Sequence, residues 1–385
     1  MTSVLILSLL AASTAAPVDD CTGMVPLIDM GPGQTYQGQP GGLYPGGVKY
    51  LGGPHLAEGM HRAVRIRPLD ANGNPDPNGK IVLLSIGMSN TSQEFGEFIR
   101  SLDAYPDKNP AVVVVNGAQG GQDARQIANP NAPFWSVVDD RLAQAGVTRA
   151  QVQAVWHKEA VARPTLPFPD HAIELRELHE AAMNILASRF PNLKIVYSSS
   201  RIYAGYAETD LNPEPYAYES AFSVRWLIRD QINGDPGLNY DPRRGPVTSP
   251  WIQWGPYLWA DGVCGRSDGL QWFRQDFAQD GTHPSASGRR KVAAMLLQHF
   301  TSAPTARIWF LRPGLGVLLG DMNGNGQIDG GDANAYLLYE ADPKEFARRY
   351  PNVDPIESGD ITEDGVTDNR DLLEFMHILI RFTSL

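Results

Sequence analysis

Four continuous apolar runs, separated by amphipathic helical patterns, constrain the fold of this chain more than any other feature. A strand that is apolar at every position is buried on both of its faces. Such strands alternating with helices predict a parallel sheet that is covered by helices on both sides. We therefore expect an α/β fold with three layers, helix, sheet and helix. The four runs are residues 81–86, 111–115, 152–156 and 194–197.

The expected helices carry apolar residues at helical spacing. The clearest pattern covers residues 171–190, with Ile173, Leu175, Leu178, Ala182 and Ile185 on one face. Residues 22–60 are instead rich in Gly and Pro, and this composition predicts an irregular lead-in without a helix. Further helices are expected over residues 93–102, 219–232 and 286–300.

The first 15 residues form a short apolar run that ends in small residues, the pattern of an export signal cleaved after Ala15. No segment has the roughly 20 apolar residues that a transmembrane helix needs. We therefore expect an exported, soluble protein without a membrane span. Two cysteines, Cys21 and Cys264, are present. In an oxidising compartment they would pair, but two unpaired buried thiols fit the sequence equally well.

In an open parallel sheet, ligands bind at the carboxyl ends of the strands. The first strand runs directly into Gly87-Met88-Ser89-Asn90. A serine at this point can act as a nucleophile, because its transition state gains from backbone N–H groups at the start of a helix. The alternative is that Ser89 caps the following helix, a common role for serine at such positions.

Residues Asp280-Gly-Thr-His283-Pro-Ser precede the last helix of the α/β region. An Asp and a His three residues apart at a helix start can meet side by side. The carboxylate then holds one imidazole nitrogen while the other nitrogen faces a nucleophile. This pattern predicts a catalytic triad of Ser89, Asp280 and His283.

The second and third strands also end in polar or glycine-rich segments. Residues 116–123 contain the pair Gly120-Gly121, which allows close approach of the backbone to a ligand. A phosphate-binding loop is excluded here because the Lys-Ser/Thr pair of such loops is absent. The third strand ends in Trp156-His157-Lys158-Glu159, and we expect these side chains to face the same crevice. Alternatively, His157 is a structural histidine and Glu159 begins a helix.

The order of these blocks resembles that of the SGNH (GDSL-like) hydrolases over about residues 75–305. Block one reads Gly-Met-Ser-Asn, and Trp156-His-Lys-Glu159 is similar to a segment of the acetylesterase branch of that family. The resemblance implies a flavodoxin-like α/β/α sandwich and an acyl-enzyme mechanism. It assigns Ser89 as nucleophile, His283 as base and Asp280 as its orienting carboxylate. It also implies an oxyanion hole in which a Gly, Gly121 or next to it Gly120, and an Asn of the third block join the serine N–H. Lys158 stands where that Asn is expected, and we expect its ammonium to donate instead.

The acidic tail contains two 12-residue windows that start 39 residues apart. Residues 321–385 hold 14 acidic and 5 basic residues, so most of the net charge of −11 lies here. Each window has oxygen-bearing side chains at positions 1, 3, 5 and 12, Gly at position 6 and a backbone carbonyl at position 7, as a calcium loop requires. The expected ligands are Asp321, Asn323, Asn325, Gln327 and Asp332 in the first window and Asp360, Thr362, Asp364, Val366 and Asp371 in the second.

Each window is followed by a helical pattern, over residues 333–341 and 372–380. The tail thus resembles a type I dockerin, a small all-α domain that binds Ca²⁺ and a cohesin-like scaffold partner. We expect a signal peptide (1–15), a hydrolase domain (16–311), a linker (312–319) and the dockerin-like domain (320–385).

These observations predict a secreted serine ester hydrolase that acts on an acylated glycan as a carbohydrate O-acetylesterase. A lipase or thioesterase of the same family, or a non-catalytic glycan-binding module, remain the alternatives. Trp251, Trp254, Tyr257 and Trp259 are candidates for stacking on sugar rings, and core packing explains them equally well. No basic stripe exists to bind nucleic acid.

Overall fold

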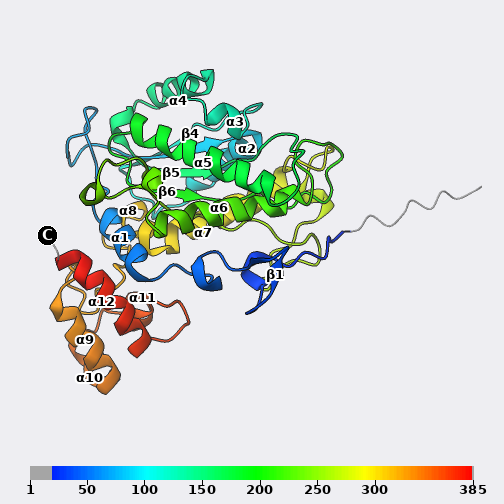
Figure 1. Cartoon of the computed structure of the whole chain (residues 1–385). Helices are drawn as coiled ribbons and strands as arrows, with labels where there is room; N and C mark the ends of the chain where they lie inside the picture. Colours follow the sequence, from blue (N-terminus) through cyan, green and yellow to red (C-terminus); the bar gives the residue numbers. More distant parts are fainter. Residues whose placement is uncertain (1–19, 384–385) are drawn as a thin grey trace, which may run out of the picture.

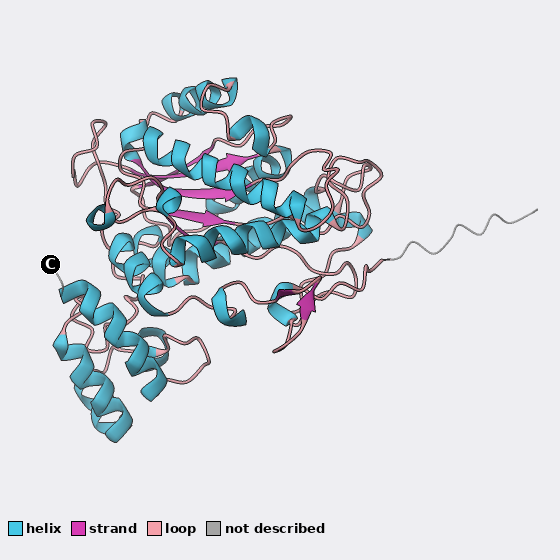
Figure 2. Ribbon diagram, viewed as in Figure 1, coloured by secondary structure: helices cyan, strands magenta, loops and turns pink. Residues whose placement is uncertain are grey.

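The computed structural model describes residues 20–383. The proposed export signal lies outside the described residues. The centre of the fold is a parallel sheet (Figure 2). Its five strands have the order β4-β3-β5-β6-β7. The strands are β3 (Ile81–Gly87), β4 (Val112–Asn116), β5 (Val152–Lys158), β6 (Ile195–Ser198) and β7 (Trp251–Trp254).

Counted along the chain, this strand order is 2-1-3-4-5, the order of flavodoxin-like sheets. Four of the strands match the apolar runs of the sequence to within two residues. The fifth, β7, was not predicted. All four aromatic residues at 251–259 that were candidates for sugar stacking have less than 5% of their surface exposed, so they belong to the core.

Helices cover both faces of the sheet, which confirms the expected mixed α/β class (Figures 1 and 2). On one face, Phe95 stacks on Trp156 and Phe300 packs edge-on against Tyr197. On the other face, His179 packs edge-on against His157. The first face carries α2 (Ser89–Leu102), α7 (Ala286–Ser302) and α8 (Pro304–Phe310), and the second carries α5 (Asp170–Arg189) and α6 (Tyr216–Ile232).

The lead-in is less irregular than expected, because its last part forms helix α1 (Gly53–Ala63). Pro54 stands in the first turn of α1, where its missing N–H costs nothing. His55 of α1 stacks on Trp251 of β7, so this helix covers the edge of the sheet. Upstream lie a short hairpin, β1 (Thr35–Tyr36) and β2 (Gln39–Pro40), and two 3-10 turns, Leu27–Asp29 and Pro45–Gly47.

Cys21 and Cys264 form a disulfide, which settles the alternative that the sequence left open. The neighbouring Thr22 and Gly23 donate backbone N–H groups to the Asp261 carboxylate at 2.6 and 2.9 Å. The start of the described chain is thus fastened to the α/β body by one covalent bond and a bidentate hydrogen-bonded contact.

The tail forms a small all-α unit with its own apolar core (Figure 1). This core includes Leu56, Ala57 and Met60 from α1, so the tail packs directly on the α/β body. Glu58 of α1 pairs with Arg381, which ties the last helix to the same surface. The tail helices are α9 (Gly330–Ala341), α10 (Pro343–Arg349), α11 (Pro355–Gly359) and α12 (Asn369–Thr383).

The remaining elements are short and connect these layers. Among the described helices, none combines the length and the apolar character needed to cross a membrane. The remaining elements are α3 (Ala124–Ile127), α4 (Pro133–Gln144) and the 3-10 turns Arg149–Gln151, Pro236–Leu238, Pro242–Arg244 and Arg274–Asp276.

Candidate active site

Ser89, His283 and Asp280 come together at the carboxyl end of β3. The Ser89 Oγ lies 2.8 Å from His283 Nε2, and His283 Nδ1 lies 2.5 Å from Asp280 Oδ2. Because the carboxylate accepts the Nδ1 proton, Nε2 is free to accept the serine proton. Three side chains predicted from two separate sequence blocks thus form one continuous hydrogen-bonded line.

The alternative role of Ser89 as a helix cap is not what the structure shows. The N-cap of α2 is Met88, and Ser89 is the first helical residue. Its Oγ points to His283 instead of satisfying the helix N–H groups. The first N–H groups of a helix lack intrahelical partners, so Ser89 lies where backbone donors gather.

The turn that carries Asp280 and His283 has a conformation that requires Gly281. Its φ is +63°, and a Cβ there would lie 1.6 Å from the carbonyl oxygen of Tyr206. The Asp280 Oδ1 accepts the backbone N–H groups of Thr282 and His283, both at 3.0 Å. The carboxylate therefore fixes the turn as well as the imidazole.

Hydrogen bonds also control the charge of Asp280. Partial burial works to raise the pKa of Asp280, but the hydrogen bonds from His283 and Thr282 outweigh it and hold that pKa below its ordinary value. The carboxylate consequently stays ionised beside the imidazole. An ionised partner stabilises the imidazolium that would form during proton transfer.

Asn90 is a contributor that sequence analysis did not assign. Its buried Nδ2 donates to the carbonyl oxygen of Thr282 at 2.9 Å, which joins α2 to the Asp280–His283 turn. Asn90 adjoins Ser89, so this bond is one of the contacts that hold the nucleophile near its base. The signal was present in the sequence as the Ser89-Asn90 pair, but its partner carbonyl lies 192 residues away.

The glycine loop after β4 does reach the serine, through Gly120 more directly than through Gly121. A Cβ on Gly120 would lie 3.9 Å from Ser89 Cβ, whereas a Cβ on Gly121 would meet nothing within 4 Å. The loop is held in place by the Gln119 N–H, which donates to the carbonyl of Gly87 at 2.9 Å. Gly121 has φ +73°, so it forms the turn that follows.

The proposed oxyanion role of Lys158 is not supported, because its ammonium already has a partner. Lys158 Nζ lies 2.7 and 2.5 Å from the two oxygens of Glu94, and both side chains are fully buried. Burial, opposed by the Glu94 charge, lowers the pKa of Lys158 to about 8. The pair joins β5 to α2 beneath the site.

The expectation that residues 156–159 face one crevice is wrong. Successive side chains of a strand point to opposite faces, so Lys158 faces α2 whereas His157 faces α5. His157, Lys158 and Glu159 are at most 1% exposed, and none of them lines an open cleft. The segment is polar because Lys158 pairs with a buried carboxylate, and not because its side chains line a cleft.

The two tail windows adopt the same hydrogen-bonded loop. In the first, Asp321 accepts the N–H groups of Asn325 and Gly326, at 3.0 and 2.7 Å. In the second, Asp360 accepts those of Asp364 and Gly365, at 3.0 and 2.8 Å. The last carboxylates, Asp332 and Asp371, are fully buried and accept N–H groups from positions 3 and 9 of their own windows.

The donor set of these loops fits a hard cation such as Ca²⁺, which takes oxygen ligands. Thr362 Oγ1, at position 3 of the second window, is buried without a hydrogen-bond partner. Burial, with the charges of Asp321 and Asp329, raises the pKa of Asp332 to about 6. The Thr362 hydroxyl thus lacks a hydrogen-bond partner, and the Asp332 carboxylate lies beside two like charges.

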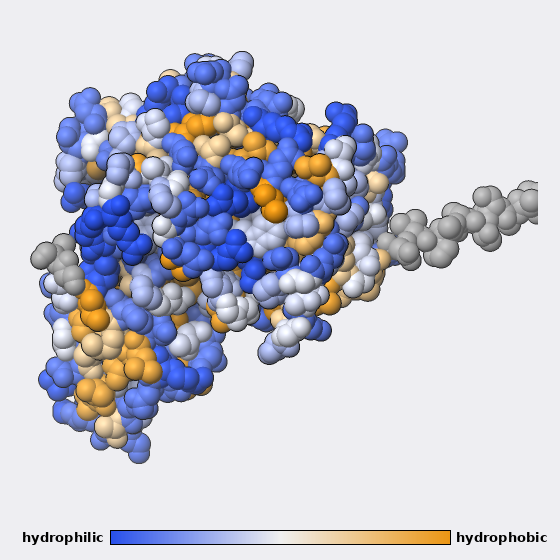
Figure 3. Space-filling model, viewed as in Figure 1, coloured by the Kyte–Doolittle hydropathy of each residue, from blue (hydrophilic) through white to orange (hydrophobic). Residues whose placement is uncertain are grey.

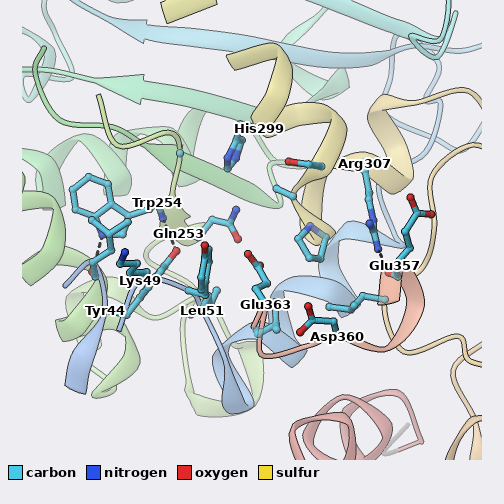
Figure 4. A pocket seen from close by; sticks show the side chains of 18 of the residues that line it. Tyr44, Lys49, Leu51, Gln253, Trp254, His299, Arg307, Glu357, Asp360 and Glu363 are labelled. Carbon is cyan, nitrogen blue, oxygen red and sulfur yellow. Dashed lines mark hydrogen bonds between the residues drawn. The ribbon is translucent and has the colours of Figure 1, made fainter. Parts of the chain in front are cut away.

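Two cavities lie between the α/β body and the tail, away from the triad. One of about 350 Å³ is lined by residues of both parts, including Tyr44, Trp254, Arg307 and Asp360 (Figure 4). Another, of about 1130 Å³, adjoins it along α1 and α12. Neither includes Ser89 or His283 in its lining. The triad itself is open, with the side chains of His283 and Asp280 25% and 35% exposed.

No family model and no curated protein matches this chain. Among solved structures it is similar to an acetylxylan esterase of Geobacillus stearothermophilus, at 18% identity and TM-score 0.34, over 57% of this chain and 93% of that one. It is also similar to an α/β hydrolase from the metagenome of Lake Arreo, Spain, at 14% identity and TM-score 0.31, over 57% and 94%. A third is the periplasmic domain of a Salmonella lipopolysaccharide acetyltransferase, at 12% identity and TM-score 0.31, over 64% and 95%. Because the TM-scores are this low, these similarities support no conclusion about function. The function is therefore inferred from the side-chain geometry.

Proposed function

We propose that this protein is a serine ester hydrolase with Ser89 as nucleophile, His283 as general base and Asp280 as the orienting carboxylate. One observation carries the proposal, the line of contacts from Ser89 Oγ through His283 to Asp280 at 2.8 and 2.5 Å. A nucleophile, a base and an orienter in hydrogen-bond reach are the geometric signature of acyl transfer through a covalent intermediate.

In the first step of the proposed mechanism, His283 Nε2 takes the Ser89 proton while Oγ attacks the ester carbonyl. The leaving alcohol receives that proton from His283, and an acyl-enzyme remains on Ser89. Water, deprotonated by the same imidazole, then releases the acid and restores the serine. Asp280 keeps the Nδ1 proton throughout and stabilises the imidazolium.

The oxyanion donors that the structure favours are backbone groups. Ser89 begins α2, where N–H groups lack intrahelical partners, and the Gly120 backbone approaches the serine side chain. Removal of one such donor costs about 10²–10³ in kcat in comparable sites. The charged pair Lys158–Glu94 takes a supporting position below them.

The proposed substrate class is an acylated glycan, with the enzyme acting as an O-acetylesterase. The partly exposed triad supports this choice, because an acetyl group on a bulky carrier needs an open nucleophile and no deep acyl tunnel. A lipase or thioesterase is the same-class alternative. Comparing acetate release from acetylated polysaccharides with hydrolysis of long-chain esters separates the two.

The decisive experiment compares Ser89→Ala with Ser92→Ala, a serine one turn further along the same helix. Hydrolysis of p-nitrophenyl acetate should fall by about 10³-fold or more in the first variant and stay near wild type in the second. A serine-directed phosphonate should label wild type at Ser89. Unchanged hydrolysis in Ser89→Ala would refute the assignment of Ser89 as nucleophile. Wild type that neither hydrolyses the ester nor is labelled would favour the non-catalytic glycan-binding module instead.

We propose in addition that the two tail loops bind Ca²⁺ through Asp321, Asn323, Asn325, Gln327 and Asp332 and through the corresponding five residues of the second loop. The support is the shared loop geometry and the partnerless Thr362 oxygen. Calcium would stabilise helices α9 and α12, which begin within the two windows. Chelation with EGTA should lower the melting temperature of the tail, and readdition of Ca²⁺ but not Mg²⁺ should restore it.

Asp332→Asn and Asp371→Asn remove the buried carboxylate of each loop and test the loops separately. Each variant should lose about one bound Ca²⁺ in titration calorimetry, as expected for one ion per loop. Exposed Asp342→Asn, which lies between the loops, is the control. Equal calcium binding in all three variants would refute the ligand assignment.

Export to an oxidising compartment is part of the proposal, and the Cys21–Cys264 disulfide supports it. A cohesin-like scaffold partner stays a prediction. The tail does present an apolar surface, seen in orange at the lower left of Figure 3. The exposed apolar residues of the tail include Leu337 and Leu373.

A further inference from the structure

A second cluster of reactive side chains lies inside the α/β body, on the face of the sheet opposite Lys158 and Glu94. It consists of His157 in β5, Glu159 directly after β5, and His179 in α5. All three are at most 1% exposed. One metal-binding atom from each lies within 4.8 Å of those of the other two. The proposed ester chemistry uses none of them.

These side chains lack hydrogen-bond partners to an unusual extent. His157 Nε2, both carboxylate oxygens of Glu159 and both ring nitrogens of His179 are buried with no hydrogen bond. His157 Nε2 and Glu159 Oε1 are 2.9 Å apart, but not in hydrogen-bonding geometry. Each unsatisfied buried polar group costs about 1–3 kcal/mol, and a buried carboxylate costs more. Five such atoms in one place therefore indicate a missing positive partner.

The remaining nitrogen of the first histidine is already oriented. His157 Nδ1 lies 3.2 Å from the Oγ of Ser198, on the neighbouring strand β6. Metal-bound histidines commonly use the second ring nitrogen in this way, and the contact turns Nε2 toward the metal. Here it turns Nε2 toward Glu159 and His179.

We propose that His157, Glu159 and His179 form a structural site for a divalent transition metal of the zinc class. Two imidazoles and one carboxylate are a zinc ligand set, whereas calcium takes oxygen ligands only. Ligand atoms on a tetrahedral zinc lie about 3.4 Å apart, given bonds of about 2.0–2.1 Å. In the cluster the ligand atoms lie within 4.8 Å of one another, so metal binding requires the side chains to move closer together.

The role assigned to this site is structural. The metal would join β5 to α5 across the layer boundary and neutralise the buried Glu159 carboxylate. Three protein ligands leave the fourth position of a tetrahedral site to the second Glu159 oxygen or to a water, and complete burial keeps a substrate away from it. The proposal is therefore independent of the ester hydrolase and of the tail calcium loops, and it can fail without affecting either.

Because the ligands are buried, the metal must enter during folding, so the test uses full-length protein expressed with added Zn²⁺ or Co²⁺. The purified protein is dialysed against buffer that is free of zinc and cobalt and contains excess Ca²⁺, which keeps the tail loops occupied. Wild type should retain about one equivalent of zinc by elemental analysis, as expected for a single site. The cobalt form should show the visible d–d absorption of a four-coordinate ion.

His179→Leu should lose the metal and the cobalt absorption, whereas His299→Leu should keep both. His299 is a matched control because its Nε2 is also buried without a partner, but it lies in α7 on the other face. Glu159→Gln repeats the test with a nearly isosteric side chain, and near-UV circular dichroism confirms folding. Wild type without zinc or cobalt absorption, or equal metal content in folded His179→Leu or Glu159→Gln, would overturn the proposal.

Discussion

His283 Nδ1 lies 2.5 Å from Asp280 Oδ2, and the other oxygen of that carboxylate accepts the backbone N–H of His283 at 3.0 Å. One carboxylate therefore positions both the ring and the backbone of the proposed base. The pairing is local, because three positions separate the two residues, yet it needs a glycine between them to close the turn.

Asp280→Asn should lower kcat for p-nitrophenyl acetate by about 10³–10⁴-fold, because the amide no longer holds the productive imidazole tautomer. KM should change little, since Asp280 does not contact the acyl group in the proposed mechanism. Steady-state kinetics checks both values. Asp210→Asn, at an exposed position, is the control. A loss below tenfold would assign the orienting role to another residue.

The same residue predicts how stability changes with pH. The pKa of Asp280 is held below its ordinary value, so its contribution to stability is present above the unfolded pKa of about 4 and is lost as pH falls through the folded pKa. Urea denaturation of wild type and Asp280→Asn should give stabilities that differ at neutral pH and converge in acid. A constant difference across pH would contradict this assignment.

Asn90→Ala should impair catalysis although Asn90 takes no part in bond making. It removes the donor to the Thr282 carbonyl and leaves that buried oxygen unpaired, at a cost of about 1–3 kcal/mol. The turn that carries His283 then shifts relative to Ser89. We expect kcat to fall more than KM rises, and labelling of Ser89 by a phosphonate to slow in parallel. Asn90→Ala with wild-type kcat would show that other contacts fix the turn.

The Lys158–Glu94 pair gives a test of the discarded oxyanion role. Lys158→Met alone should destabilise the protein by about 3–5 kcal/mol, because it leaves the Glu94 charge buried without a partner. The double variant Lys158→Met/Glu94→Leu should recover most of that loss in urea denaturation and should keep ester hydrolysis. A stable double variant with hydrolysis reduced more than 100-fold would return Lys158 to the catalytic machinery.

Replacing Cys21 and Cys264 by serine should lower stability by about 2–5 kcal/mol, since the disulfide closes a loop of 243 residues. The Asp261 contacts to Thr22 and Gly23 remain, so the native fold should persist. Differential scanning calorimetry with and without reductant measures the effect. A melting temperature that is insensitive to both changes would show that the disulfide adds nothing to stability.

Local patterns were sufficient to predict most of the sheet and the triad. The apolar runs identified β3, β4, β5 and β6 because a strand buried on both faces is apolar at every position, a property of the run itself. Asp280 and His283 lie in one turn, so their pairing followed from spacing alone. The two 12-residue tail windows were likewise visible as a repeat, and the structure gives them matching hydrogen bonds.

Contacts between distant segments could not be predicted in this way. The Lys158 ammonium pairs with Glu94 across 64 residues, and His179 joins His157 and Glu159 from a separate helix. Strand β7 is short and rich in tryptophan, so its composition did not separate a core strand from a sugar-binding surface. The sequence determined which side chains lie at strand ends and in turns, because spacing along the chain sets these positions. Only the tertiary structure decided which buried charge meets which partner, because packing across layers brings those groups together.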